Sequence, residues 1–242
     1  MAIGYCDWSS QEIAIAAALS GDQRLWEAYS SGDPYIAFAV AAGLAPDGAT
    51  KETHKDVRNR CKPVVLGTNY GMSAYGVAQA AQISELEAKA LLQKHYETYY
   101  EFWNWAENNK ERGLLGLQLE TCFGWSLQVT AGDVKANTFL NWPIQAHGAE
   151  MLRIACILAV ESGIKLCAPI HDALLIEAPA DQIDAEVARL KDCMFEASEA
   201  VLGDGKVCRV DADIVRYPDR YMDEHGKQMW NQIMGLLAQT QG

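Results

Sequence analysis

Two aspartates in this chain stand where apolar, strand-like segments end. Asp7 follows the apolar residues 3–6, and Asp172 separates the apolar runs 165–170 and 173–176. Divalent cations such as Mg²⁺ prefer carboxylate oxygens, so two aspartates that converge across a sheet could hold such ions. Taken singly, each aspartate is more simply explained as a solvated turn residue or a helix cap.

A second group of residues predicts a helix with a mixed face. Arg58, Lys62, Leu66 and Tyr70 recur every fourth residue and therefore share one side of a helix. The two cations could bind phosphate groups, and the apolar and aromatic side chains beyond them could pack on a base. The alternative interpretation is an amphipathic surface helix whose Arg and Lys are solvated.

Three segments, in this order, resemble motifs A, B and C of the family A DNA polymerases. They are Cys-Asp-Trp-Ser-Ser-Gln-Glu at residues 6–12, the helix at residues 58–71, and Ile-His-Asp at residues 170–172. The similarity extends over about residues 3–217. It implies an α+β fold: a polymerase palm with an antiparallel sheet and helices, a helical fingers subdomain, and no thumb or exonuclease domain in this chain.

The resemblance implies template-directed addition of deoxynucleotides to the 3′ end of a primer. Asp7 and Asp172 would bind two Mg²⁺ ions, with Mn²⁺ as a substitute, and Lys62 would join them in catalysis by protonating pyrophosphate. Nucleotide contacts are implied for Ser9, Ser10, Glu12, Tyr35, Arg58, Lys62, Leu66 and Tyr70. DNA contacts are implied for Asn141, Gln145 and His171.

For four of these residues the resemblance implies a specific role. Glu12 matches a glutamate that excludes a ribose 2′ hydroxyl, although a lone glutamate at a helix start is ordinarily a dipole partner or cap. Tyr70 matches a tyrosine beside the templating base, and His171 a histidine next to the primer terminus. Gln145 matches a glutamine that tests the minor groove of the new pair, where acceptors are shared by all correct pairs.

The chain also departs from the family pattern. Ala173 follows the motif C aspartate where the family commonly has a glutamate, so the site has one carboxylate fewer. Tyr35 replaces a phosphate-contacting histidine, and Leu66 replaces a Phe or Tyr that stacks on the incoming base. Trp125-Ser126 stands where arginines are common. These choices resemble the bacteriophage branch of the family.

The sequence predicts one compact unit with an inserted helical region. We expect the first part of the palm at residues 1–21, fingers at 22–135, the second part of the palm at 136–225 and a helical extension at 226–242. Pro63 predicts a kink in the motif B helix because it cannot donate a helical hydrogen bond.

Apolar patterning predicts the individual elements. Strands are expected at residues 3–6 and 207–216, a hairpin at motif C, strand-like pairing around Gly124 over residues 117–130, and helices at 11–19, 146–163 and 183–200. The aromatic residues of 96–105 are expected to be buried in a helical core, with base stacking as the alternative. An apolar stripe in the extension is expected to cover the core, with docking of a partner as the alternative; it comprises Met229, Trp230, Ile233, Met234 and Leu237.

Charge and cysteine content limit the classes of function. The net charge of −12 opposes nonspecific binding of nucleic acid, but five of the cations gather within residues 51–62. Seven scattered cysteines without zinc-site spacing predict a reduced, cytoplasmic protein of a bacterial or phage-infected cell, and no apolar run is long enough to predict a membrane span.

The leading hypothesis is therefore a DNA-directed DNA polymerase whose partners are primer-template DNA and deoxynucleoside triphosphates. A separate polypeptide that supplies the thumb or exonuclease, as in a split polymerase, is a further possible partner. The competing hypothesis is a degenerate or truncated relative that binds DNA, nucleotide or another protein. A single-subunit RNA polymerase is a third, and Glu12 argues against it.

Overall fold

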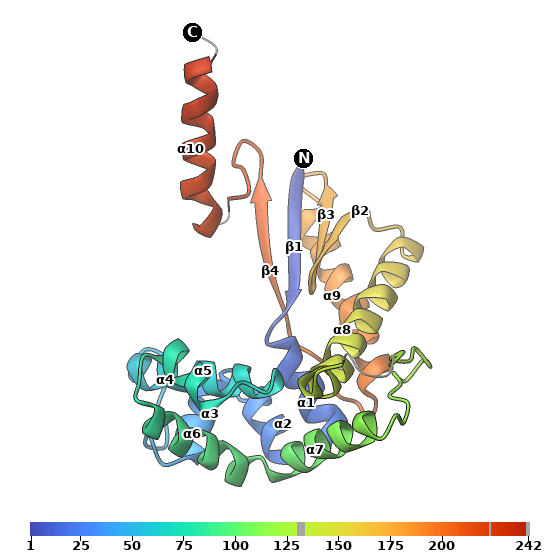
Figure 1. Cartoon of the computed structure of the whole chain (residues 1–242). Coiled ribbons are helices and arrows are strands. Elements are labelled where there is room, and N and C mark those ends of the chain that lie inside the picture. Colours follow the sequence, from blue (N-terminus) through green and yellow to red (C-terminus); the bar gives the residue numbers. More distant parts are fainter. Residues whose placement is uncertain (130–133, 223, 241–242) are drawn as a thin grey trace.

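A four-stranded antiparallel sheet forms one half of the protein. The computed structural model describes residues 1–129, 134–222 and 224–240. The strand order is β2-β3-β1-β4, with β1 at Ala2–Trp8, β2 at Leu166–Ile170, β3 at Ala173–Ala178 and β4 at Val210–Arg216 (Figure 1). The predicted strands and the motif C hairpin are confirmed, and so is the α+β class.

Alternation along β1 explains how the sheet packs. Every second residue of β1 is buried, including Cys6 and Trp8, as expected for a strand with one covered face. The helix α9, Ile183–Leu202, covers this face, and the Trp8 indole Nε1 donates to the carbonyl of Met194 at 3.3 Å. Gly4 permits the close approach of α9, because a Cβ there would lie 2.5 Å from Val187 Cγ2.

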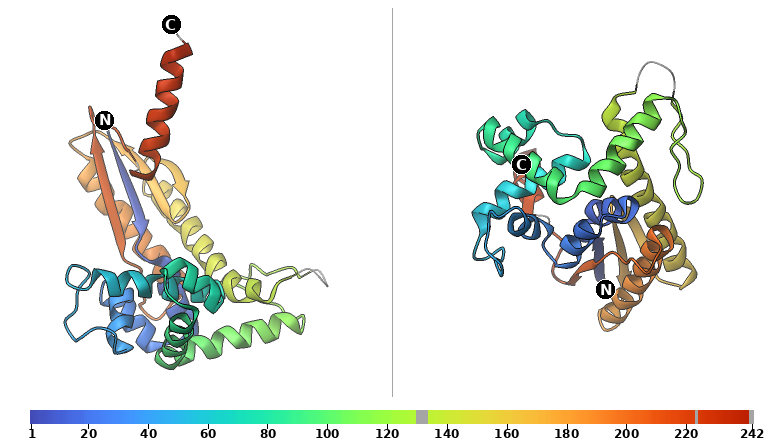
Figure 2. Two further views of the ribbon diagram at one scale, coloured as in Figure 1. Left: turned by 60° about the vertical axis from the view of Figure 1, so that its left-hand side comes forward. Right: turned by 90° about the horizontal axis from the view of Figure 1, so that it is seen from below.

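Seven helices form the second half, which we call the helical half (Figure 2). They are α1 at Gln11–Ser20, α2 at Gln23–Ser30, α3 at Pro34–Ala41, α4 at Lys55–Asn69, α5 at Ala74–Ala81, α6 at Glu85–Thr98 and α7 at Tyr100–Leu114. Several begin at side-chain caps, and a capping box of Ser84 and Glu87 opens α6. Pro63 lies inside α4, which remains one continuous helix.

The aromatic segment of the helical half is partly buried, as expected. Tyr99 and Phe102 are at most 1% exposed, and Phe38 packs beside them. Tyr96 and Tyr100 are 40% and 52% exposed, so burial does not extend to the whole segment. His95 lies within the aromatic cluster, where its Nδ1 accepts from the Trp103 indole at 3.1 Å.

One long helix connects the two halves. The helix α8, Ala136–Glu161, packs against α7 and α1 of the helical half and against α9 and β2 beside the sheet (Figure 1). We predicted a helix only from residue 146; the structure begins it at Ala136 and continues it through Pro143. Asn141 and Gln145 therefore project from α8.

The predicted pairing around Gly124 is present but short. Glu120 and Ser126 form an antiparallel bridge, the backbone N–H of Leu127 donates to the carbonyl of Leu119 at 2.9 Å, and Gly124 lies in the turn at φ 81°. Thr130, the last residue of the predicted segment 117–130, lies outside the described residues. Among the described residues the two arms join no larger sheet, and an isolated two-stranded hairpin is only marginally stable.

The prediction that the C-terminal stripe covers the core is wrong. The helix α10, Glu224–Thr240, extends beyond the end of the sheet (Figures 1 and 2) instead of covering the core. Its five stripe residues are 46–66% exposed. Among the described contacts, the covered face of the sheet is packed by α9 and not by α10. Among the described residues, no helix has the length and apolarity needed to cross a membrane.

Candidate active site

Asp7 and Asp172 meet at one end of the sheet. Asp7 on β1 pairs with Ala173 on β3, and the backbone N–H of Trp8 donates to the carbonyl of Asp172 at 3.3 Å. His171 and Asp172 form the two-residue turn of the motif C hairpin, with His171 at φ 57°. Residues far apart in the sequence thus place one carboxyl group on β1 and another in the turn beside it, as their positions at strand ends predicted.

A third carboxyl group joins this pair from the edge strand. Asp211 on β4 lies directly opposite Asp7 across the ladder, and the Ser9 hydroxyl donates to its Oδ2. Burial raises the pKa of Asp7 above its ordinary value, and the charges of Asp172, Asp211 and Asp213 raise it further. Our sequence analysis missed Asp211. The Asp-Ala-Asp alternation within the predicted closing strand was the signal that could have revealed it.

The chemistry of this donor set fits a hard divalent cation, because carboxylate oxygens are the ligands that Mg²⁺ prefers. Asp7 and Asp172 would hold it. Among the described residues, no group of three or more His, Cys, Asp or Glu side chains has the geometry of a complete metal site. Oxygens from a bound ligand would therefore have to complete the coordination.

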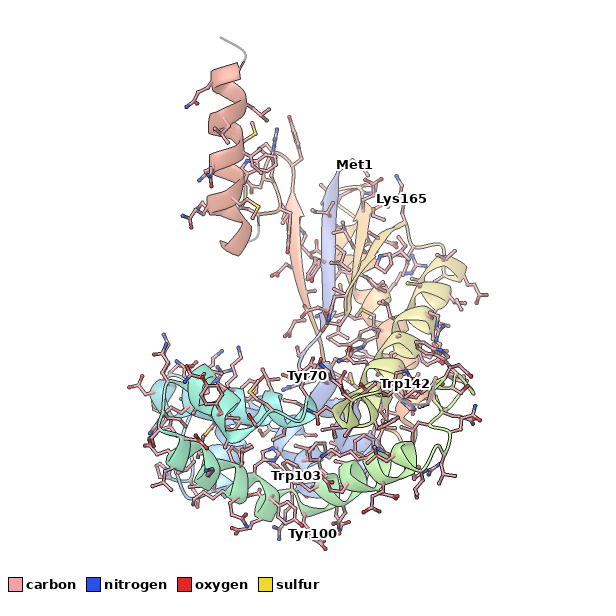
Figure 3. The ribbon with its side chains drawn as sticks, in the orientation of Figure 1. Met1, Tyr70, Tyr100, Trp103, Trp142 and Lys165 are labelled. Carbon is pink, nitrogen blue, oxygen red and sulfur yellow. The ribbon has the colours of Figure 1, made fainter. Side chains whose placement is uncertain are left out.

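Glu12 joins three helices at the junction of the two halves. Its Oε1 accepts hydrogen bonds from the Tyr70 hydroxyl and, at 2.6 Å, from the Gln145 amide Nε2. Tyr70 follows the end of α4 and is 46% exposed at this junction (Figure 3). Burial raises the pKa of Tyr70 to about 12, and the hydrogen bond and negative charge of Glu12 contribute. The predicted sugar, template and minor-groove residues thus form one hydrogen-bonded group.

The predicted phosphate-binding cations gather around Tyr35. The Arg58 guanidinium carbon lies 4.8 Å from the centre of the Tyr35 ring, and the Lys62 Nζ lies 5.9 Å from it. Arg58 also forms an ion pair with Asp33 at 2.5 Å. Burial raises the pKa of Tyr35, while a hydrogen bond with Ser10 acts in the opposite direction. Ser10 lies two residues beyond the end of β1, the strand that carries Asp7, so Tyr35 links the two cations to the chain segment that leaves this strand.

The remaining predicted residues are less closely integrated. Leu66 is half-buried and packs against the core. The Asn141 Nδ2 lies 3.5 Å from the carbonyl of Asn69, at the limit of a hydrogen bond. The His171 side chain is 76% exposed, and its Nδ1 lies 3.1 Å from Asp172 Oδ1.

A cavity of about 1040 Å³ lies elsewhere in the helical half. Its lining includes the charged residues Arg24, Lys51 and Lys94 together with Asp33 and Arg58. None of Asp7, Glu12, Tyr70 or Asp172 is among its described lining residues. Asp7, Glu12 and Asp172 are half-buried and Tyr70 is exposed, so all four retain some access to solvent outside this cavity.

Comparison with known proteins assigns this arrangement to a family. DNA polymerase family A matches residues 2–211. The thermostable DNA polymerase I of Thermus filiformis is 27% identical over 203 residues, which cover 79% of this chain and 24% of that protein. DNA polymerase I of Lactococcus lactis subsp. lactis is 27% identical over 213 residues, covering 80% and 24%.

A solved structure agrees with the fold. The POL domain of Pol1 from M. smegmatis, in a complex with DNA primer-template and dNTP, superposes with a TM-score of 0.75 over 89% of this chain and 40% of that one. At 24% identity this similarity shows the fold alone. The chain spans about a quarter of the length of the two curated relatives above. Its placement in the bacteriophage branch stays a prediction, as do the limits of palm, fingers and extension.

Proposed function

Because the chain belongs to DNA polymerase family A, we propose that it carries the nucleotidyl-transfer site of a DNA-directed DNA polymerase. The observation that supports this best is the meeting of Asp7, on β1, with Asp172, in the turn before β3, in a chain whose next residues lead to Ser10 and Glu12. Metal-binding carboxylates, phosphate-binding cations and a base-pair surface are the three parts that nucleotide addition needs.

In the proposed reaction, Asp7 and Asp172 hold two Mg²⁺ ions at the end of the sheet. Bound there, Mg²⁺ supplies activation of the primer 3′ hydroxyl and neutralises charge on the departing pyrophosphate. Arg58 and Lys62 bind the phosphates of the incoming nucleotide, with donors fixed before the ligand arrives. Lys62 also donates a proton to the pyrophosphate oxygen that leaves.

The Glu12 group recognises the nucleotide and the pair it forms. The Glu12 carboxylate occupies the space beside C2′ of the sugar, so that a ribose 2′ hydroxyl would collide with it. The hydrogen bonds from Tyr70 and Gln145 hold that carboxylate in place. Tyr70 and Gln145 then contact the templating base and the minor groove, where acceptors common to all correct pairs permit a test of shape.

Primer extension tests this function. The purified chain is mixed with a labelled primer, Mg²⁺ and one deoxynucleotide at a time on four templates that differ only in the first unpaired base. We expect addition of the complementary nucleotide on each template. Addition that ignores the template base would overturn the assignment as a template-directed enzyme.

A non-catalytic role is the second candidate, and Ala173 favours it. Ala173 stands beside Asp172 where the family commonly has a glutamate, which leaves the site less anionic. A chain that binds primer-template DNA or nucleotide without extending the primer would fit this role. One subunit of a split polymerase would instead gain activity when a thumb-bearing polypeptide is added.

A further inference from the structure

Asp33 connects the start of α3 to the side chain of Arg58 on α4. Its Oδ1 accepts hydrogen bonds from the backbone N–H groups of Tyr35 at 3.1 Å and Ile36 at 3.2 Å, which makes Asp33 the N-cap of α3. Its Oδ2 accepts from the Arg58 Nε at 2.5 Å. The Arg58 and Asp33 side chains are only 24% and 22% exposed. Asp33 is thus fixed by the backbone and in turn fixes Arg58.

The Arg58 guanidinium is held on a second side by an aromatic ring. Tyr35, two residues after Asp33, lies 4.8 Å from the Arg58 guanidinium carbon. Arginine has five N–H donors, and Asp33 occupies the one on Nε. The two terminal NH₂ groups are the donors that remain for a ligand, in the fork geometry that suits phosphate oxygens.

From these contacts we propose that Asp33 is a positioning residue for triphosphate binding: it orients Arg58 so that the terminal nitrogens meet the phosphates. The proposal rests on the function proposed above for Arg58. A mobile arginine side chain loses rotamer freedom when it binds a ligand, and this loss weakens binding. Because Asp33 and Tyr35 already restrict the Arg58 side chain, less freedom remains to be lost when phosphate binds. Asp33 itself touches no phosphate.

Simple electrostatics predicts the opposite effect of Asp33. A carboxylate 2.5 Å from the Arg58 Nε reduces the positive potential that an anionic ligand meets. Removing its charge would then strengthen the binding of phosphates. If orientation dominates, removing the charge weakens binding. The sign of the change in affinity therefore distinguishes the two effects.

Asp33→Asn is the informative variant, and Asp56 provides the matched control. Asparagine is as good an N-cap as aspartate, so α3 keeps its cap while Arg58 loses its charged partner. Asp56 is an exposed residue on α4, two positions before Arg58, and residues so spaced do not face each other on a helix. Asp56→Asn changes the net charge equally near the same arginine but removes no contact with Arg58 in the described structure.

Inorganic tripolyphosphate is the probe, because it carries the charge of the nucleotide tail without base or sugar. Its affinity is measured by isothermal titration calorimetry in buffer with EDTA. We expect Asp33→Asn to weaken binding about fivefold, the loss typical of freeing one long side chain. Asp56→Asn should bind as well as the unmodified chain or better. Adding Asp33→Asn to Arg58→Ala should cause no further loss, because Asp33 acts only through Arg58.

Each outcome decides the proposal. Unchanged or tighter binding by Asp33→Asn would overturn the positioning role and leave the phosphate role of Arg58 standing. If the unmodified chain does not bind tripolyphosphate, or Arg58→Ala binds equally well, the phosphate role fails and the positioning role fails with it. Thermal melting checks folding, and Asp33→Ser, which keeps a capping oxygen, replaces Asp33→Asn if the latter does not fold.

Discussion

Replacing Asp7 with asparagine should stabilise the protein while it removes the proposed metal site. The Asp7 carboxyl is half-buried and faces Asp172, Asp211 and Asp213, and burial and these charges raise its pKa. A carboxyl with a raised pKa in the native state binds its proton more tightly there than in the unfolded chain. At neutral pH the ionised Asp7 therefore destabilises the native state, and asparagine relieves this.

The size of the effect follows from the exposure of Asp7. Solvent screens a half-exposed carboxyl, so the gain is about 0.5–1 kcal/mol at pH 7. For a chain of this length the gain corresponds to a rise in Tm of about 1–4 °C. The destabilisation is fully present above the raised native pKa and absent below the ordinary value of 3.8. The advantage of the variant should therefore vanish in strong acid.

Magnesium should stabilise the unmodified chain but not the Asp7→Asn variant. If Asp7 and Asp172 hold Mg²⁺, free ion at ten times its Kd stabilises the native state by about 1.4 kcal/mol. The Tm should then rise by about 3–6 °C, and Asp7→Asn should lose this response.

Thermal melts of both proteins in EDTA and in Mg²⁺ measure these shifts. Asp192→Asn, an exposed change on α9, serves as the control and should keep the full Mg²⁺ response. A lower Tm for Asp7→Asn than for the unmodified chain in EDTA would refute the claim that the ionised Asp7 carboxylate destabilises the native state. A Mg²⁺ response that survives in Asp7→Asn would refute the metal site.

Three further changes test other parts of the account. Glu12→Ala should lower the preference for deoxynucleotides over ribonucleotides about 10–100-fold in single-nucleotide extension, and an unchanged preference would exclude Glu12 from the sugar site. Ser84→Ala should lower stability by about 1 kcal/mol, or Tm by about 2–4 °C, because it breaks the capping box of α6; an unchanged melting curve would contradict this. Burial lowers the pKa of His95 from 6.5 to about 3, so its contribution to stability is present above pH 6.5 and is lost as the pH falls. Urea unfolding at pH 7 and pH 5 should show a loss about 2 kcal/mol larger for the unmodified chain than for His95→Gln, and equal losses would refute this.

The sequence predicted those parts of the molecule that local patterns determine. Apolar runs predicted β1 and the motif C hairpin, and the position of Asp7 and Asp172 at strand ends predicted their meeting. The spacing of Arg58, Lys62 and Tyr70 predicted one helix face, although Tyr70 lies just beyond the end of α4.

Other features depend on contacts between distant residues, which no local pattern specifies. The pairing of Asp211 with Asp7 requires the register of β4 against β1. The apolar stripe of α10 predicted burial against the core, which is wrong, because the path of residues 217–222 leads the helix away from the core (Figure 1). The ion pair of Asp33 with Arg58 joins two helices, and nothing in the sequence around either residue indicates which charged residue it pairs with.

Primer extension by Asp7→Asn and Asp192→Asn, beside the unmodified chain, tests the central claim most directly. The claim is that Asp7 and Asp172 form the metal-binding centre of a DNA polymerase. We expect the unmodified chain and Asp192→Asn to extend a DNA primer equally with deoxynucleotides and Mg²⁺, and folded Asp7→Asn to give no product. Extension by Asp7→Asn at a comparable rate, or no extension by the folded unmodified chain, would contradict the claim.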